Sequence, residues 1–236
     1  MIFIGLDVSK ISTALCIEKN NKIKLYNYTT KKDNNIWVKD TSPFIEYRHI
    51  TYNYSNEKDY SKSEMIKLNE FDQITDLIIT DIFDNIKVLD SVRIGIEGYA
   101  YKANGPVFDL IEYTTFLKYK LMNKMGKFST IQIISPLTLK SECCRMTYKP
   151  RIELVGKRVI KEVLHYENTK GVQSNKFDKW DMFHALIDGD INMELKEWCK
   201  EYKEHITKNK DVPKPLDDAI DSIFIVEMLK KQYFQK

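Results

Sequence analysis

The most informative segment of this chain is IFIGLDVSKISTALCI, residues 2–17. Two apolar runs, 2–8 and 11–17, flank a short polar turn, a pattern that predicts the two strands of a β-hairpin. Asp7 lies at the end of the first run. Burying a lone carboxylate in an apolar strand is unfavourable by several kcal/mol unless a metal ion or a charged partner neutralises it. A metal ion bound at Asp7 would need further acids from later segments of the chain.

Two later segments carry such acids. The first, SVRIGIEGY, reads as a short strand with Glu97 at its carboxyl end. The second, PKPLDDAIDSIFI at 213–225, places acids in the first turn of a predicted helix, where the helix dipole favours them. Asp218 and Asp221 share one face of this helix, and Asp217 and Asp221 also share one, because residues three and four apart are neighbours. One acid from each of two strands and two from a helix form the oxygen-rich set that hard divalent cations require.

The order of these acids along the chain resembles that in a known family, the RuvC-like Holliday-junction resolvases of the RNase H-like superfamily. The matching stretches are GLDVS at 5–9, IEGYAYKANG at 96–105, SPLTLK at 135–140 and DAIDS at 218–222. Within the family, the sequence looks most like the resolvases of phages and large DNA viruses. The resemblance implies that Asp7, Glu97, Asp218 and Asp221 are the catalytic acids and metal ligands, with Asp217 as the alternative for the third position.

The resemblance also implies the reaction. The chain would be a crossover-junction endodeoxyribonuclease, acting in DNA recombination and repair or in viral genome processing. Each active site would hold two Mg²⁺ ions, for which Mn²⁺ would substitute, and hydrolysis would leave a 5′-phosphate and a 3′-hydroxyl. The substrate would be branched DNA, chiefly the four-way junction, and no nucleotide cofactor would be needed. A homodimer would present one active site to each of the symmetry-related strands.

Each acid also has an ordinary interpretation. Asp7 could be a turn acid, Glu97 a solvated residue at a strand end, and Asp217 and Asp218 first-turn acids stabilised by ~0.3–1 kcal/mol each through the helix dipole. Their joint occurrence in the order of the family favours the metal site.

Three rival functions remain open. The nearest is another RNase H-like nuclease, acting on branched DNA or on RNA–DNA hybrids, because the same acids serve all of them. An actin-like sugar kinase also begins with a strand-Asp-turn-strand loop, but it needs a second glycine-rich phosphate loop, and Asp188-Gly189-Asp190 follows no predicted strand. A non-catalytic DNA-binding protein of the same fold is the third.

Composition predicts one domain, 1–236, in a cytoplasmic protein, or in the host cytoplasm if the chain is viral. The 236 residues are 43% hydrophobic and 30% charged, enough for one sizeable core. No apolar run approaches the ~20 residues that cross a membrane. The chain also opens directly into a strand rather than a signal peptide. The cysteines show no C-x-x-C spacing, which favours reduced thiols over disulfides or zinc ligands; they are Cys16, Cys143, Cys144 and Cys199.

Basic residues concentrate in one segment. The whole chain has a net charge of only +3, whereas residues 140–179 hold ten basic and five acidic side chains. Such clustering favours contact with DNA phosphates over a merely solvated surface. Within it we predict contacts from Lys140, Lys176 and Lys179. Tyr99 and Tyr101 follow Glu97 and could stack on exposed bases, which contributes ~1–3 kcal/mol per base, although ordinary packing is the alternative for each.

The remaining patterns predict an α/β fold: an RNase H-like mixed five-stranded sheet flanked by helices, with insertions near 33–62 and 141–212. The predicted strands are 2–8, 12–18, 22–30, the run around Glu97, and 130–134, with an extra strand possible within 44–52. The predicted helices are 63–87, 107–125, one starting at Pro136, a stretch at 159–165, one at 180–185, a charged helix within 192–212, and the helix of the last acids.

The predicted helix 107–125 has two apolar sides. The second contains Phe108, Tyr113, Phe116, Tyr119 and Met122. This side could be buried in the core, or it could form the interface of the implied homodimer.

Overall fold

The computed structural model describes residues 1–87, 90–99, 107–125, 129–146, 149–155, 159–165, 178–189, 194–202, 206 and 212–234. The chain divides into two compact units, of which the first combines Met1–Pro136 with Lys214–Lys236 and the second is Leu137–Pro213. The second unit nearly coincides with the insertion predicted at 141–212. That 1–236 forms a single domain stays a prediction.

The first unit is built on a mixed six-stranded sheet in the order β4-β3-β2-β1-β5-β6. Its strands are β1 (Ile2–Asp7), β2 (Ser12–Lys19), β3 (Lys22–Thr29), β4 (Ile45–His49), β5 (Val92–Glu97) and β6 (Ser129–Ile134). β2 runs antiparallel to β1 and β3, whereas β5 runs parallel to β1 and to β6. The predicted α/β class with a mixed sheet flanked by helices is confirmed. The sheet has a sixth strand because the optional strand within 44–52 forms, as β4, and pairs with β3.

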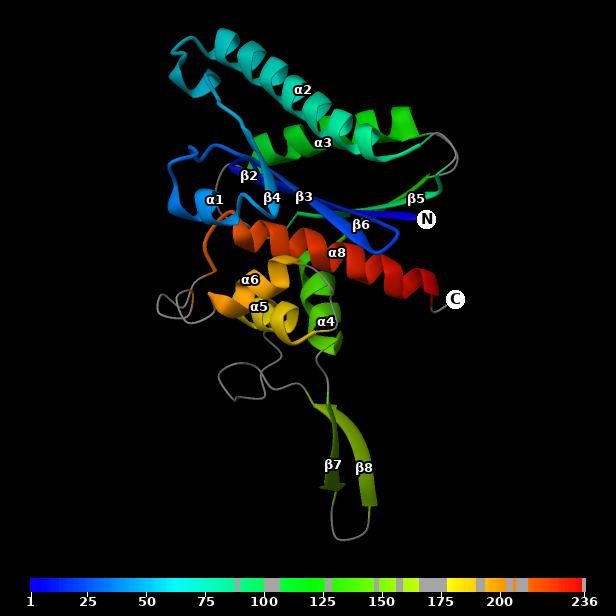
Figure 1. Ribbon diagram of the computed structural model, residues 1–236. Helices are drawn as coiled ribbons and strands as arrows, with labels where there is room; N and C mark the ends of the chain where they lie inside the picture. Colours follow the sequence, from blue (N-terminus) through cyan, green and yellow to red (C-terminus); the bar gives the residue numbers. More distant parts are fainter. Residues whose placement is uncertain are drawn as a thin grey trace. The chain divides into compact units, whose positions relative to one another are not determined.

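Alternation along β1 divides its side chains between two layers of helices. Successive residues of a strand point to opposite faces. Ile2, Ile4 and Leu6 belong to a core shared with two helices, α2 (Tyr60–Asn85) and α3 (Val107–Met125). Phe3 and Gly5 face the other side, where they meet the helix α8 (Leu216–Phe234). Figure 1 shows α2 and α3 on one face of the sheet and α8 on the other. Asp7, in phase with Phe3 and Gly5, is therefore on the α8 face.

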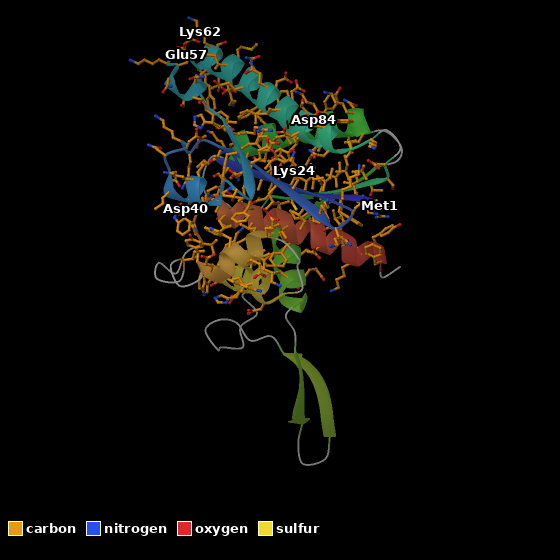
Figure 2. The ribbon with its side chains drawn as sticks, viewed as in Figure 1. Met1, Lys24, Asp40, Glu57, Lys62 and Asp84 are labelled. Atoms are coloured by element: carbon orange, nitrogen blue, oxygen red, sulfur yellow. The ribbon has the colours of Figure 1, made fainter. Side chains whose placement is uncertain are left out.

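Charge is distributed as expected for a sheet covered on both faces. The labelled charged residues Lys24, Asp40, Lys62 and Asp84 are exposed on the outside of the first unit (Figure 2).

The short helices α1 (Ile36–Thr41) and η1 (Tyr54–Asn56) lie in the segment 33–62, where an insertion was predicted. Among the described residues, none of the helices has the length and the apolar composition of a membrane-spanning segment.

The second unit contains helices and a β-hairpin. Its helices are α4 (Pro136–Met146), α5 (Lys179–Asp188) and α6 (Glu194–Glu201), and its strands are β7 (Lys149–Val155) and β8 (Val159–His165). The prediction that 159–165 is helical was wrong, because this segment pairs antiparallel with β7 from Val155 opposite Val159 to Lys149 opposite His165. The apolar spacing in VIKEVL fits a helix, but β-branched residues favour a strand once a partner strand is available.

The helix α3 has one buried and one exposed side, and two residues of the predicted second apolar side lie on the buried one. Tyr113 is fully buried, with its hydroxyl 3.2 Å from Thr13 Oγ1, and Phe116 is partly buried against the core. Phe108, Tyr119 and Met122 are 82%, 66% and 70% exposed. The exposed apolar side is thus narrower than predicted.

A charged network joins the turn after β1 to the helices behind the sheet. Asp109, in the first turn of α3, accepts hydrogen bonds from Lys10 Nζ at 2.8 Å and from the Tyr54 hydroxyl at 2.7 Å. The buried Lys67 Nζ lies 3.5 Å from the other oxygen of Asp109. Burial alone would raise the pKa of Asp109, but these hydrogen bonds and positive charges lower it below its usual value.

We expect Asp109→Ala to lower the free energy of unfolding by about 1.5–3 kcal/mol, because two lysines and a tyrosine lose a charged partner. A lowered carboxyl pKa stabilises the fold above the unfolded-state value of about 3.9. That stabilisation is lost as the pH falls through the folded-state pKa. The difference between wild type and Asp109→Asn in urea denaturation should therefore be present at pH 7 and shrink below pH ~4. Asp76→Ala is the control: the Asp76 carboxylate is exposed and Lys120 keeps its second ion pair, with Asp72, so the loss should be under about 1 kcal/mol. Equal effects of the two alanine variants would contradict the prediction.

Candidate metal centre

Asp7 and Glu97 are brought together by two adjacent parallel strands. In the register of β1 and β5, Gly5 is opposite Gly95 and Leu6 is opposite Ile96. The next residues are Asp7 and Glu97, the last of their strands. Because the strands are parallel, their carboxyl ends meet at the same edge of the sheet. Asp7 is 5% exposed and Glu97 is half-buried.

Two glycines allow α8 to approach this edge. A Cβ atom on Gly5 would lie 2.1 Å from the backbone oxygen of Ser222, and one on Gly95 would lie 2.4 Å from Ile225 Cγ2. Any side chain at Gly5 would therefore push the backbone of α8 away from the sheet. The close approach places Asp221, the residue before Ser222, over the ends of β1 and β5.

Three carboxylates converge as a result. One oxygen from each of Asp7, Glu97 and Asp221 lies within 4.8 Å of the other two. Asp7 and Asp221 are buried, and like charges so close in a buried position repel one another. A donor set made only of carboxylate oxygens fits a hard divalent cation such as Mg²⁺ or Mn²⁺, which would relieve this repulsion. We call these three residues the carboxylate cluster.

Asp218 lies beside the carboxylate cluster but is not one of its members. It is 2% exposed, and its Oδ1 accepts a hydrogen bond from Lys214 Nζ at 2.7 Å. Its Oδ2 is buried and accepts no hydrogen bond from the described residues. Asp217 Oδ2 is 3.9 Å from the same ammonium. Burial alone would lower the pKa of Lys214, but the charges of Asp218, Asp217 and Asp7 raise it.

The residues predicted to contact DNA fall into three groups. Tyr99 is half-buried, with Lys118 Nζ 4.7 Å from its ring centroid and its hydroxyl 3.4 Å from the carbonyl oxygen of Ile111. Lys140, on α4, and Lys179, at the start of α5, are half-buried residues of the second unit. Tyr101 and Lys176 lie outside the described residues.

The roles of Gly5, Gly95 and Lys214 were not predicted from the sequence. A signal for the glycines was present, because Gly5 is two residues before Asp7 and Gly95 is two residues before Glu97. Residues two apart in a strand share a face. A glycine at this spacing indicates that the face carrying the acid is approached closely by another element. Nothing comparable in the sequence marks Lys214.

Comparison with protein families and with characterised sequences finds no match. Solved structures do resemble the chain. One is the yeast mitochondrial Holliday junction resolvase Ydc2, with 12% identity and a TM-score of 0.47, covering 95% of this chain and 75% of Ydc2. Another is RuvC from Thermus thermophilus, with 9% identity and a TM-score of 0.42, covering 98% of this chain and 96% of RuvC. At these identities, the function proposed below rests on the residues of the site. The phage or viral placement stays a prediction.

Proposed function

We propose that this chain is a divalent-metal-dependent endonuclease that resolves four-way DNA junctions by paired phosphodiester hydrolysis. The observation that carries the proposal is the carboxylate cluster, whose oxygens come from two parallel strand ends and a helix. Its residues belong to the motifs that resemble RuvC-like resolvases. Recombination, repair or viral genome processing would be the setting, and the location would be cytoplasmic.

The acids of the site would act as metal ligands. Asp7, Glu97 and Asp221 of the carboxylate cluster, together with Asp218, would hold two Mg²⁺ ions. When bound, such ions lower the pKa of a water molecule and stabilise negative charge on the phosphate. The buried acids would hold fixed positions for the scissile phosphate, because α8 packs directly against Gly5 of β1 and Gly95 of β5. The products would carry a 5′-phosphate and a 3′-hydroxyl.

Binding of DNA would use residues outside the carboxylate cluster. The basic segment 140–179, including Lys140, Lys176 and Lys179, would contact phosphates, and Tyr99 or Tyr101 would contact bases or sugars. A homodimer would place one site at each of two symmetry-related strands. The exposed apolar residues of α3, Phe108, Tyr119 and Met122, support an interface there.

The direct test is cleavage of an end-labelled four-way junction with and without Mg²⁺, beside a linear duplex, a three-way flap and an RNA–DNA hybrid. We expect paired symmetric nicks in the junction, only when the metal is present. Equal cutting of flaps would indicate a general branched-DNA nuclease, and cutting of the hybrid alone a ribonuclease. Tight junction binding with no cutting in Mg²⁺ or Mn²⁺ would contradict the proposal and favour a DNA-binding protein.

A further inference from the structure

The side chain of Lys214 places a positive charge beside the candidate metal centre. It lies just before α8, four residues ahead of Asp218, and its ammonium is 2.7 Å from Asp218 Oδ1 and 3.9 Å from Asp217 Oδ2. Asp218 is almost completely buried, whereas the Lys214 side chain is 44% exposed. The lysine thus reaches from the surface to a carboxylate in the interior.

This arrangement answers an electrostatic need of the metal-free protein. A buried carboxylate requires a compensating charge, and Asp218 lies three residues before Asp221, a member of the carboxylate cluster, on the same helix. Lys214 offsets part of this negative charge. The same ammonium repels any other cation brought to the site, because two positive charges a few ångströms apart in a partly buried position interact strongly.

We propose that Lys214 competes with the divalent cation for Asp218 and thereby sets the affinity of the centre for its metal. In the metal-free protein the ammonium neutralises Asp218, and metal binding requires the Lys214–Asp218 ion pair to separate. The exposure of the lysine makes this possible, since its side chain can turn into solvent without disturbing the core. The inference rests on the metal centre of the proposed function and adds a control on its occupancy.

If the Lys214–Asp218 ion pair only stabilised the start of α8, a different result would be expected. Removing such a pair would weaken the fold and leave metal affinity the same or lower. Competition requires the opposite change in affinity. The two interpretations are therefore separated by measuring metal binding together with stability.

The experiment uses the full chain without DNA and titrates it with Mn²⁺, reading bound metal by electron paramagnetic resonance and by calorimetry. We expect Lys214→Met to bind Mn²⁺ more tightly, on the order of tenfold, because the competing charge is gone. Its metal-free melting temperature should fall, and added Mn²⁺ should raise that temperature by more than it does in the wild type. Lys214→Gln, which keeps a hydrogen-bond donor but no charge, should show the same tightening if Lys214→Met does not fold.

Lys230→Met is the matched control. Lys230 is on the same helix and pairs with the buried Glu18 at 2.9 Å, at the opposite end of the β1–β2 pair from Asp7. This variant should lose stability without any change in Mn²⁺ affinity. Unchanged or weaker Mn²⁺ binding by both Lys214 variants would overturn the inference. A wild type that binds no Mn²⁺ would overturn the metal centre as well, whereas Mn²⁺ binding without DNA cleavage would refute only the nuclease.

Discussion

Asp7→Asn is expected to lower the rate of junction cleavage at least about 10³-fold while leaving junction binding within about twofold of wild type. Asp7 ends β1, an interior strand of the sheet, and one of its oxygens lies within 4.8 Å of oxygens of Glu97 and Asp221 in the carboxylate cluster. Asparagine keeps the shape of the side chain but removes the charge that a divalent cation requires. Single-turnover cleavage of a labelled junction in saturating Mg²⁺ and binding in Ca²⁺ measure the two quantities separately.

The same substitution should stabilise the protein when no metal is present. One buried negative charge is removed from a group of three, so their repulsion decreases. We expect the metal-free melting temperature to rise by about 2–4 °C, the shift that corresponds to ~1 kcal/mol in a chain of this length. Asp33→Asn, an exposed acid of the same unit, should change neither cleavage nor melting temperature. Near-normal cleavage by Asp7→Asn would refute the assignment of the site.

Gly5→Ala should have the largest effect on the fold. The added methyl group would lie 2.1 Å from the backbone oxygen of Ser222 and 3.1 Å from Ile225 Cβ. A backbone atom inside a packed helix cannot move aside as a flexible side chain can. We expect the free energy of unfolding to fall by about 3 kcal/mol or more. Cleavage should be lost as well, because α8 would have to lift away and carry Asp221 from Asp7.

Urea denaturation followed by circular dichroism measures the loss in stability, and Mn²⁺ titration measures the loss of the metal centre. Gly98→Ala is a suitable comparison, because a methyl group there would meet the Ile133 Cγ2 atom at 3.2 Å, a contact that a small side-chain shift relieves. Its effect should remain below about 1 kcal/mol. If Gly5→Ala were as stable as Gly98→Ala, the close contact between β1 and α8 would not exist.

Local patterns in the sequence were sufficient for most of the first unit. The two apolar runs and the polar turn between them predicted β1 and β2, and the spacing of apolar residues predicted α2 and α3 within a few residues. These signals are reliable because each is produced by burial of one face of one element. Residues 159–165 show where such local signals are not reliable. The apolar residues of this stretch fit the spacing of a helix as well as that of a strand, and it forms a strand because it pairs with β7.

Local sequence patterns were enough to predict which acids could form the site: Asp7 and Glu97 at strand ends, and acids at the start of a helix. Which oxygens meet followed from the packing of the elements, since Asp221 joins Asp7 and Glu97 while Asp218 pairs with Lys214. A strand end or a helix face is set by neighbouring residues along the chain. The distance of α8 from β1 and β5, in contrast, depends on Gly5 and Gly95, which allow elements far apart in the sequence to touch.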